Sequence, residues 1–200
     1  MKKKSLFFLL PFAVNLVACN GTKQTTVSIN YAGDSKPVLF GIDDIKSALD
    51  RNGLTLVDKN ADYNITVSNP DQNLAEQSYQ LSVENHDITI NGGDTTGLMY
   101  GALQLAEDFN LSNGMEGLQS KEESPYIDLR GFNSRPSLDC RTPSYTNNGD
   151  SIRANVENVW DFSYWTELFD TMARKRYNLF SMANVNVFAS MIEVPGYENV

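Results

Sequence analysis

Residues 78–105 read SYQLSVENHDITINGGDTTGLMYGALQL, and this stretch decides the fold of the N-terminal half. Apolar and polar side chains alternate over 79–83 and again over 88–90, which is typical of half-buried strands. The polar residues 84–87 between them predict an antiparallel hairpin. His86, the one histidine of the chain, falls in that turn, where we expect it to be solvated. A histidine-rich metal site is therefore excluded.

The end of the same stretch predicts a helix that lies close to its sheet. Residues 92–96 end the second strand and offer N-cap side chains. Gly97 and Gly101 follow four residues apart, and each glycine costs about 1 kcal/mol relative to alanine in a helix interior. Their presence indicates a close backbone approach to the sheet or to a neighbouring domain. Apolar residues recur at helical spacing as Leu98, Ala102, Leu105 and Phe109.

The residues before this stretch add strands and a second helix. The segments 26–31, 54–57 and 63–67 predict three short strands. Apolar residues at helical spacing over 42–49 predict a helix between the first two strands, with Asp43 and Asp44 in its first turn. The predicted fold is an α+β domain, a sheet with two helices on one face.

A different pattern begins after the charged, proline-terminated linker expected over 116–125. Residues 126–132 predict a strand, 160–173 a helix and 178–185 another strand, with a long polar loop after the first strand. Strand, helix and strand are one β/α unit and the start of the next, as in a (β/α)8 barrel. Such a barrel needs about 250 residues, so 126–200 predicts only the first elements of an incomplete TIM barrel. The trio Arg174, Lys175 and Arg176 is expected to be the cationic end of the helix.

The N-terminus is an export signal. Residues 1–18 have a basic start and a short apolar run, and Leu-Val-Ala-Cys at 16–19 resembles the bacterial lipobox. That resemblance implies cleavage before Cys19 and lipid on it; the alternative is an ordinary secretory signal. We therefore expect a membrane contact through the lipid on Cys19 and a place in the cell envelope. The anchor would be at the outer membrane, facing the periplasm or the surface.

The charge and cysteine content exclude several classes of protein. The net charge of the 200 residues is −9, and it becomes −12 without residues 1–18, which carry three lysines and no acid. Such an acidic chain would be repelled by phosphate backbones, so no nucleic-acid partner is expected. Apart from Cys19 there is only Cys140, which excludes a disulfide framework. The sequence implies neither a metal nor a cofactor.

Residues 78–83, 88–94 and 97–105 together resemble the small N-terminal domain of β-N-acetylhexosaminidases and α-glucuronidases. Residues 138–145 and 160–195 are similar to glycoside hydrolase-like lipoproteins of Bacteroidetes-type bacteria. The resemblance implies a (β/α)8 catalytic barrel directly after the small domain. The domains predicted are a lipoprotein signal peptide at 1–18, a tether at 19–25, the α+β domain at 26–115, the linker at 116–125 and the truncated barrel at 126–200.

The resemblance also implies substrate-binding residues. Hexosaminidases bind sugar hydroxyls with an arginine near the end of the first barrel strand, and Arg130 is the matching position; the alternative is an arginine that bridges the two domains. Asp139 and Arg141 on the following loop, and Asn184 and Asn186 near the end of the second strand, are further candidates for binding sugar. Thr142 follows Arg141, where hexosaminidases have an Arg-His pair, and this departure leaves specificity for N-acetylhexosamine open.

The predicted function is that of the N-terminal part of a lipid-anchored glycoside hydrolase acting on poly- or oligosaccharides. No residue within 1–200 is assigned as catalytic, because the catalytic carboxylates of such barrels come from later strands. The chain would thus be a fragment or a truncated gene product, inactive alone. The alternative function is a non-catalytic lipoprotein that binds a carbohydrate or a partner; the third possibility is a remnant without function. The sequence leaves open which sugar is the substrate, and in particular whether it is an α-uronide or a β-hexosaminide. It also leaves open the oligomeric state.

Overall fold

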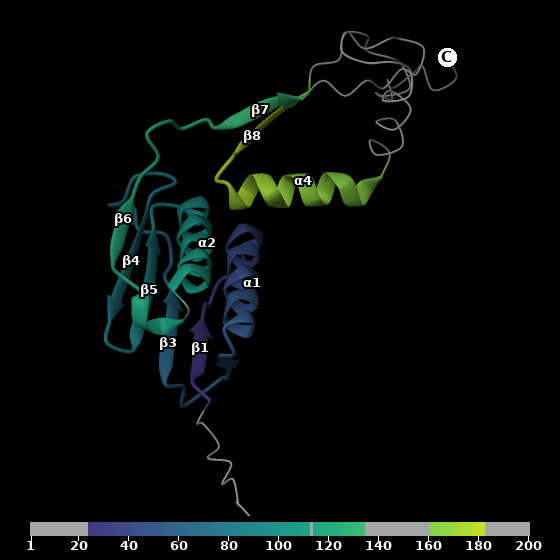
Figure 1. Cartoon of the computed structure of the whole chain (residues 1–200). Coiled ribbons are helices and arrows are strands. Elements are labelled where there is room, and N and C mark those ends of the chain that lie inside the picture. Colours follow the sequence, from purple (N-terminus) through teal and green to yellow (C-terminus); the bar gives the residue numbers. More distant parts are fainter. Residues whose placement is uncertain (1–23, 113, 135–160, 183–200) are drawn as a thin grey trace, which may run out of the picture.

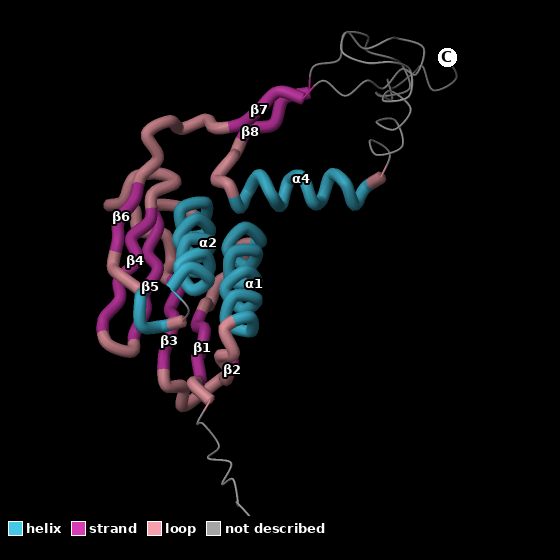
Figure 2. Tube along the Cα trace, viewed as in Figure 1, coloured by secondary structure: helices cyan, strands magenta, loops and turns pink. Residues whose placement is uncertain are grey.

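The computed structural model describes residues 24–112, 114–134 and 161–182 (Figures 1 and 2). A six-stranded sheet, two helices and a short 3-10 helix form the N-terminal part, and a two-stranded sheet with one helix forms the C-terminal part. The elements are β1 (Thr26–Asn30), α1 (Lys36–Arg51), β2 (Thr55–Leu56), β3 (Tyr63–Val67), β4 (Tyr79–Glu84), β5 (Asp87–Gly92), α2 (Thr95–Ser112), η1 (Met115–Gly117), β6 (Lys121–Glu123), β7 (Gly131–Ser134), α4 (Phe162–Arg174) and β8 (Leu179–Met182).

The large sheet is mixed, with the strand order β2-β1-β3-β5-β4-β6. β1 is parallel to β2 and β3, and β3 is parallel to β5. The predicted hairpin is confirmed, since β4 and β5 are antiparallel and Leu81 lies opposite Ile90. Both helices cover the same face of the sheet, as predicted (Figure 1). The main core lies between this face and the helices, and a second, smaller cluster contains Tyr79, Tyr100 and Leu103.

The core contains the apolar positions that the sequence pattern marks. Phe109, Leu105 and Leu98 of α2 are fully buried against Leu81 and Ile90 of the hairpin. The close approach predicted from the two helical glycines is confirmed: a Cβ on Gly101 would lie 2.6 Å from Cγ2 of Ile90, and one on Gly97 would clash with the carbonyl oxygen of Ser78. The helix thus lies on the sheet with glycine as the spacer.

The start of α1 differs from the prediction. The helix begins at Lys36, so Asp43 and Asp44 lie in its middle and not in its first turn. Ser35 stands at the N-cap and Pro37 in the first turn, where a proline costs no hydrogen bond and its fixed φ suits a helix. Val38 in this first turn is fully buried, so the buried face of the helix begins one turn before the predicted apolar pattern over 42–49.

The stretch expected to be a linker also carries secondary structure. Met115–Gly117 forms η1, and Lys121–Glu123 forms β6, which pairs antiparallel with β4 at the sheet edge. Lys121 and Asp108 of α2 form an ion pair at 2.8 Å, which ties the strand to the helix layer. The charged composition is that of an edge strand, where charges prevent pairing with other chains.

The C-terminal part is a strand–helix–strand unit. β7 and β8 are parallel, in a register from Gly131 opposite Leu179 to Ser134 opposite Met182, and α4 lies between them in the chain. The strand predicted over 126–132 is shifted: residues 126–130 are irregular, and β7 starts at Gly131. The Arg130 side chain donates to the carbonyl oxygens of Ile127 and Asp128, which is consistent with the irregular path of this segment.

Candidate functional site

β7 and β8 are parallel, so both strands begin at one edge of their sheet and end at the opposite edge. Different candidate residues lie next to each of these edges in the sequence. The chain leaves β7 after Ser134 and β8 after Met182, and parallel strands end at the same edge of their sheet. Asp139 and Arg141 follow β7 in the sequence, and Asn184 and Asn186 follow β8. All four lie outside the described residues, as does Cys19, so their roles stay predictions.

Arg130 directly precedes β7 and so lies at the opposite edge, where the strands begin. Its Nε donates to the carbonyl oxygen of Arg176 at 2.9 Å, and Nη1 donates to those of Ile127 and Asp128 at 2.5 and 3.3 Å. Its Nη2 donates to Oε1 of Gln77 at 2.9 Å and to Oη of Tyr100 at 3.1 Å. The five N–H donors of a guanidinium are thus all matched by protein acceptors. The guanidinium carbon also lies 5.5 Å from the centre of the Tyr100 ring.

Asn178, directly before β8, completes this arrangement. Its Nδ2 donates to Oε1 of Gln77 at 2.9 Å and to the carbonyl oxygen of Asp128 at 2.7 Å, while its Oδ1 accepts the backbone N–H of Arg130 at 2.8 Å. We call Gln77, Tyr100, Arg130 and Asn178 the Arg130 clasp. The clasp joins the starts of β7 and β8 to the large sheet domain. Arg130 therefore bridges the two parts through Gln77 and Tyr100, and its contact with sugar stays a prediction.

A second contact between the two parts involves the end of α4. Nε and Nη2 of Arg174 donate to the two carboxylate oxygens of Asp44 in α1, at 2.8 and 3.0 Å, and the guanidinium carbon lies 5.0 Å from the centre of the Phe40 ring. Hydrogen bonding to Asp44 raises the pKa of Arg174 above its ordinary value. Arg174 lies in the last turn and Lys175 at the C-cap, as predicted for this cationic helix end.

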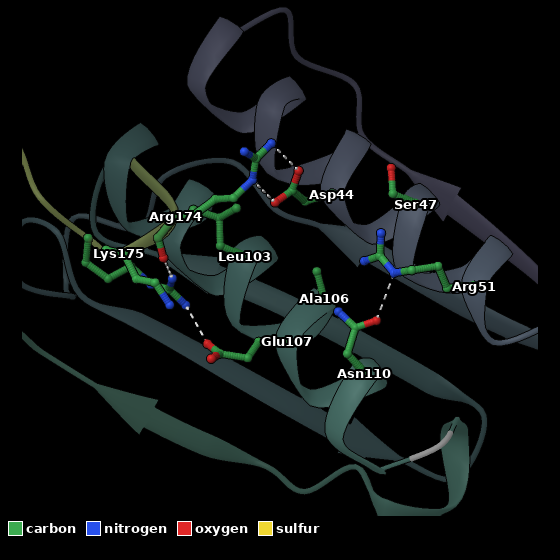
Figure 3. A pocket seen from close by; sticks show the side chains of 10 residues that line it. Asp44, Ser47, Arg51, Leu103, Ala106, Glu107, Asn110, Arg174 and Lys175 are labelled. Carbon is green, nitrogen blue, oxygen red and sulfur yellow. Dashed lines mark hydrogen bonds and ion pairs between the residues drawn. The ribbon is translucent and has the colours of Figure 1, made fainter. Parts of the chain in front are cut away.

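A groove of about 420 Å³ opens beside this contact, between α1, α2 and the end of α4 (Figure 3). Arg51, Arg174, Lys175 and Arg176 bring four positive charges to it, and Asp44 and Glu107 bring two negative charges. Its remaining lining is neutral and consists of Ser47, Leu103, Ala106 and Asn110. We call this hollow the basic groove.

Sequence reasoning found Arg130 but missed its partners. Gln77 lies in a turn with φ +60°, and Tyr100 is buried in the helix layer; neither stands in a pattern that points to a junction. His86 is exposed in the hairpin turn, as expected, with its ring stacked on Tyr63 at 4.6 Å. Within the described ranges, no helix has the length and apolar character to cross a membrane, and no three acidic, histidine or cysteine side chains gather as a metal site would require.

The comparisons with known proteins bear on the N-terminal part. Residues 18–112 match the family model described as glycosyl hydrolase family 20, domain 2. The N-terminal part is therefore similar to this domain, in line with the expected resemblance to hexosaminidases, and we call it the hexosaminidase-like domain. Strands β1 to β5 and both long helices of the hexosaminidase-like domain fall within the matched residues. No curated protein matches the chain.

Solved glycoside hydrolases share the fold. One is a GH138 enzyme targeting the pectin rhamnogalacturonan II, with a TM-score of 0.67 and 20% identity over 86% of this chain and 26% of that one. Another is a GH115 4-O-methyl-α-glucuronidase with specificity for decorated arabinogalactans, with a TM-score of 0.54 and 14% identity over 81% of this chain and 25% of that one. The chain thus spans about a quarter of the length of these structures.

Proposed function

We propose that this chain is the N-terminal part of a lipid-anchored glycoside hydrolase that cleaves glycosidic bonds of poly- or oligosaccharides. The observation that carries the proposal is the match of residues 18–112 to domain 2 of a glycoside hydrolase family. The parallel β7–α4–β8 unit that follows supports it, because a (β/α)8 barrel is built from such units. In this proposal β7 and β8 are the first two barrel strands.

The order of the candidate residues along the chain supports different roles for them in the proposed barrel. Active sites of (β/α)8 barrels lie at the C-terminal ends of the strands. Asp139, Arg141, Asn184 and Asn186 follow those ends in the sequence, which fits their predicted contact with sugar. Arg130 precedes β7, so its contribution would be to position the strand.

The chemistry would come from residues after Val200. Hydrolysis of a glycosidic bond needs a carboxylic acid to protonate the leaving oxygen, and either a second carboxylate or the acetamido group of the substrate on the other side of the bond. We propose that both carboxylates, or the single acid of a substrate-assisted mechanism, lie on later barrel strands. The 200-residue chain alone is then inactive, although it carries part of the substrate-binding face.

The experiment that tests this is to extend the reading frame past the codon for Val200 and assay the longer protein. We expect several hundred further residues of alternating strands and helices. The longer protein should hydrolyse aryl β-N-acetylglucosaminides or aryl α-glucuronides, and the 200-residue chain should hydrolyse neither. A stop codon directly after Val200, or a longer protein inactive on a wide panel of glycosides, would refute the proposal.

The lipid anchor is tested separately. The chain expressed with its N-terminus in a bacterial host should incorporate labelled palmitate and sediment with membranes. Cys19→Ser should abolish both, while Cys140→Ser, the matched control, should change neither. Absence of label on the unmodified chain would indicate an ordinary secretory signal, and label that survives Cys19→Ser would show that the lipid is attached elsewhere; either result would refute the lipid on Cys19.

A further inference from the structure

The basic groove concentrates positive charge on an acidic protein. The described residues contain nine lysines and arginines, and four of them line this one hollow, although the chain as a whole has a net charge of −9. The groove lies where the end of α4 meets α1 and α2 (Figure 3). Its lining carries two more positive than negative charges, which favours an anionic ligand.

Two of the four cations are already paired. Both carboxylate oxygens of Asp44 accept hydrogen bonds from Arg174, and Arg176 lies 3.7 Å from Glu107. These pairs connect the end of α4 to α1 and α2, and their side chains form part of the lining of the groove. Their charges largely cancel.

The other two cations keep donors for a ligand. Arg51 uses only Nε, which donates to Oδ1 of Asn110 at 3.2 Å, so no described acceptor takes the N–H groups of its two terminal nitrogens. Lys175 is exposed, and no described acceptor takes the protons of its ammonium group. Figure 3 shows the two side chains on opposite sides of the groove. A ligand that meets both needs two separated anionic groups.

The surface between them suits a sugar. Leu103 and Ala106 of α2 are apolar, while Ser47 and Asn110 at the rim offer a hydroxyl and an amide. A pyranose ring presents the same mixture, with apolar C–H faces and hydroxyl groups at its edge. The volume of about 420 Å³ lies within the usual range for a small-molecule site.

We propose that the basic groove binds an acidic oligosaccharide, with its carboxylates at Arg51 and Lys175. The choice of an anion rests on the groove alone, whereas the choice of a saccharide rests on the proposed function. The three cations Arg174, Lys175 and Arg176 lie a few residues before β8 in the chain, so the groove is near the edge where the strands start. It is therefore a second binding region, away from the end where the proposed barrel would do its chemistry.

The test is calorimetric titration of the full chain with trigalacturonate at low ionic strength. The matched probe is the carboxyl-reduced trisaccharide, which has the same rings without the charges, and inorganic sulfate is the simple anion. We expect trigalacturonate to bind at least tenfold more tightly than either probe. R51Q and K175Q should each weaken its binding about tenfold, as for loss of one charge-assisted hydrogen bond at a solvated site. Added salt should also weaken it.

The matched control is K59Q, which removes an exposed lysine that does not line the groove and should leave the affinity unchanged. The unfolding temperature of each variant shows that it is folded. Equal affinity for the neutral trisaccharide or for sulfate would overturn the acidic oligosaccharide. No binding, or unchanged binding in the R51Q/K175Q double variant, would overturn the site.

The titration involves no turnover, so its failure is distinct from failure of the proposed function. A longer protein that hydrolyses glycosides but binds no trigalacturonate would refute binding of an acidic oligosaccharide in the basic groove and leave the proposed glycosidase function intact. A chain that binds trigalacturonate through Arg51 and Lys175, but whose longer form hydrolyses nothing, would refute the glycosidase alone.

Discussion

The Arg130 clasp predicts that the Arg130 side chain makes a large contribution to holding the β7–α4–β8 unit on the large sheet domain. Arg130→Met removes all five donors but keeps an apolar stem of similar length. Two bonds to the large domain are lost, at 2.9 Å to Gln77 and at 3.1 Å to Tyr100. A charge-assisted bond contributes about 1.5 kcal/mol at the lower end, which suits a partly exposed arginine. Because Asn178 still donates to Gln77, we expect a net loss of about 2 kcal/mol, or about 30-fold in the docking equilibrium.

Hydrogen exchange measured by mass spectrometry checks this value. Amides of β7 and β8 should exchange about 30-fold faster in Arg130→Met, while those of β3, in the middle of the large sheet, keep their rates. Arg51→Met is the matched control, since Arg51 lies outside the clasp and, among the described residues, its side chain donates only to Asn110. A change below threefold in β7 and β8 would refute the reasoning, and so would an equal acceleration in β3, which would mean general destabilisation.

Three further predictions concern the hexosaminidase-like domain and α4. Phe109→Ala empties the fully buried centre of the core and should lower the free energy of unfolding by about 3–5 kcal/mol in urea titrations; a loss below 1 kcal/mol would contradict the core assignment. Gly97→Ala should destabilise the domain by about 1–3 kcal/mol in the same assay, although alanine favours helices, because the new methyl meets the Ser78 carbonyl; a stabilised variant would show that α2 can shift. Hydrogen bonds from Ser163 lower the pKa of Asp161, the N-cap of α4, so its stabilisation of the helix is present above the ordinary Asp pKa of about 3.9 and is lost as the pH falls through the lowered value. The amide of Ser163 should lose its protection from exchange over that acidic range in the wild type and already at neutral pH in Asp161→Ala; equal protection at neutral pH would exclude the cap.

The sequence predicts most strands and helices because side-chain burial follows their periods. Leu81 and Ile90 stand where the alternation places them, on the buried face of the hairpin, and Leu98 and Phe109 lie on the buried face of α2. The predicted boundaries of helices and strands are wrong where features other than the apolar pattern set them. The first turn of α1 is set by Pro37 and the N-cap position, and β6 is held at an edge where charged residues are acceptable.

The clasp was beyond sequence reasoning for a different reason. Three of the acceptors that Arg130 uses are backbone carbonyl oxygens, which every residue type carries, and Gln77 lies 53 positions away in the chain. No spacing rule connects such groups. What sequence reasoning could weigh was the residue type, and an arginine suits a sugar and a domain junction equally well. The contacts that Arg130 makes with the large sheet domain become visible only in the structure, where β7 begins one residue later, at Gly131.

The starts and the ends of β7 and β8 have different expected roles. Arg130 and Asn178 immediately precede β7 and β8, and their hydrogen bonds fix how the strands leave the hexosaminidase-like domain. The basic groove adjoins the same edge through Arg174, Lys175 and Arg176. In barrels the edge where strands begin serves stability, and the edge where they end carries the chemistry. If the proposed glycosidase function holds, an acidic glycan in the groove would anchor the protein to its substrate. Mutations in the groove should then change binding to such glycans without changing the bond-breaking step.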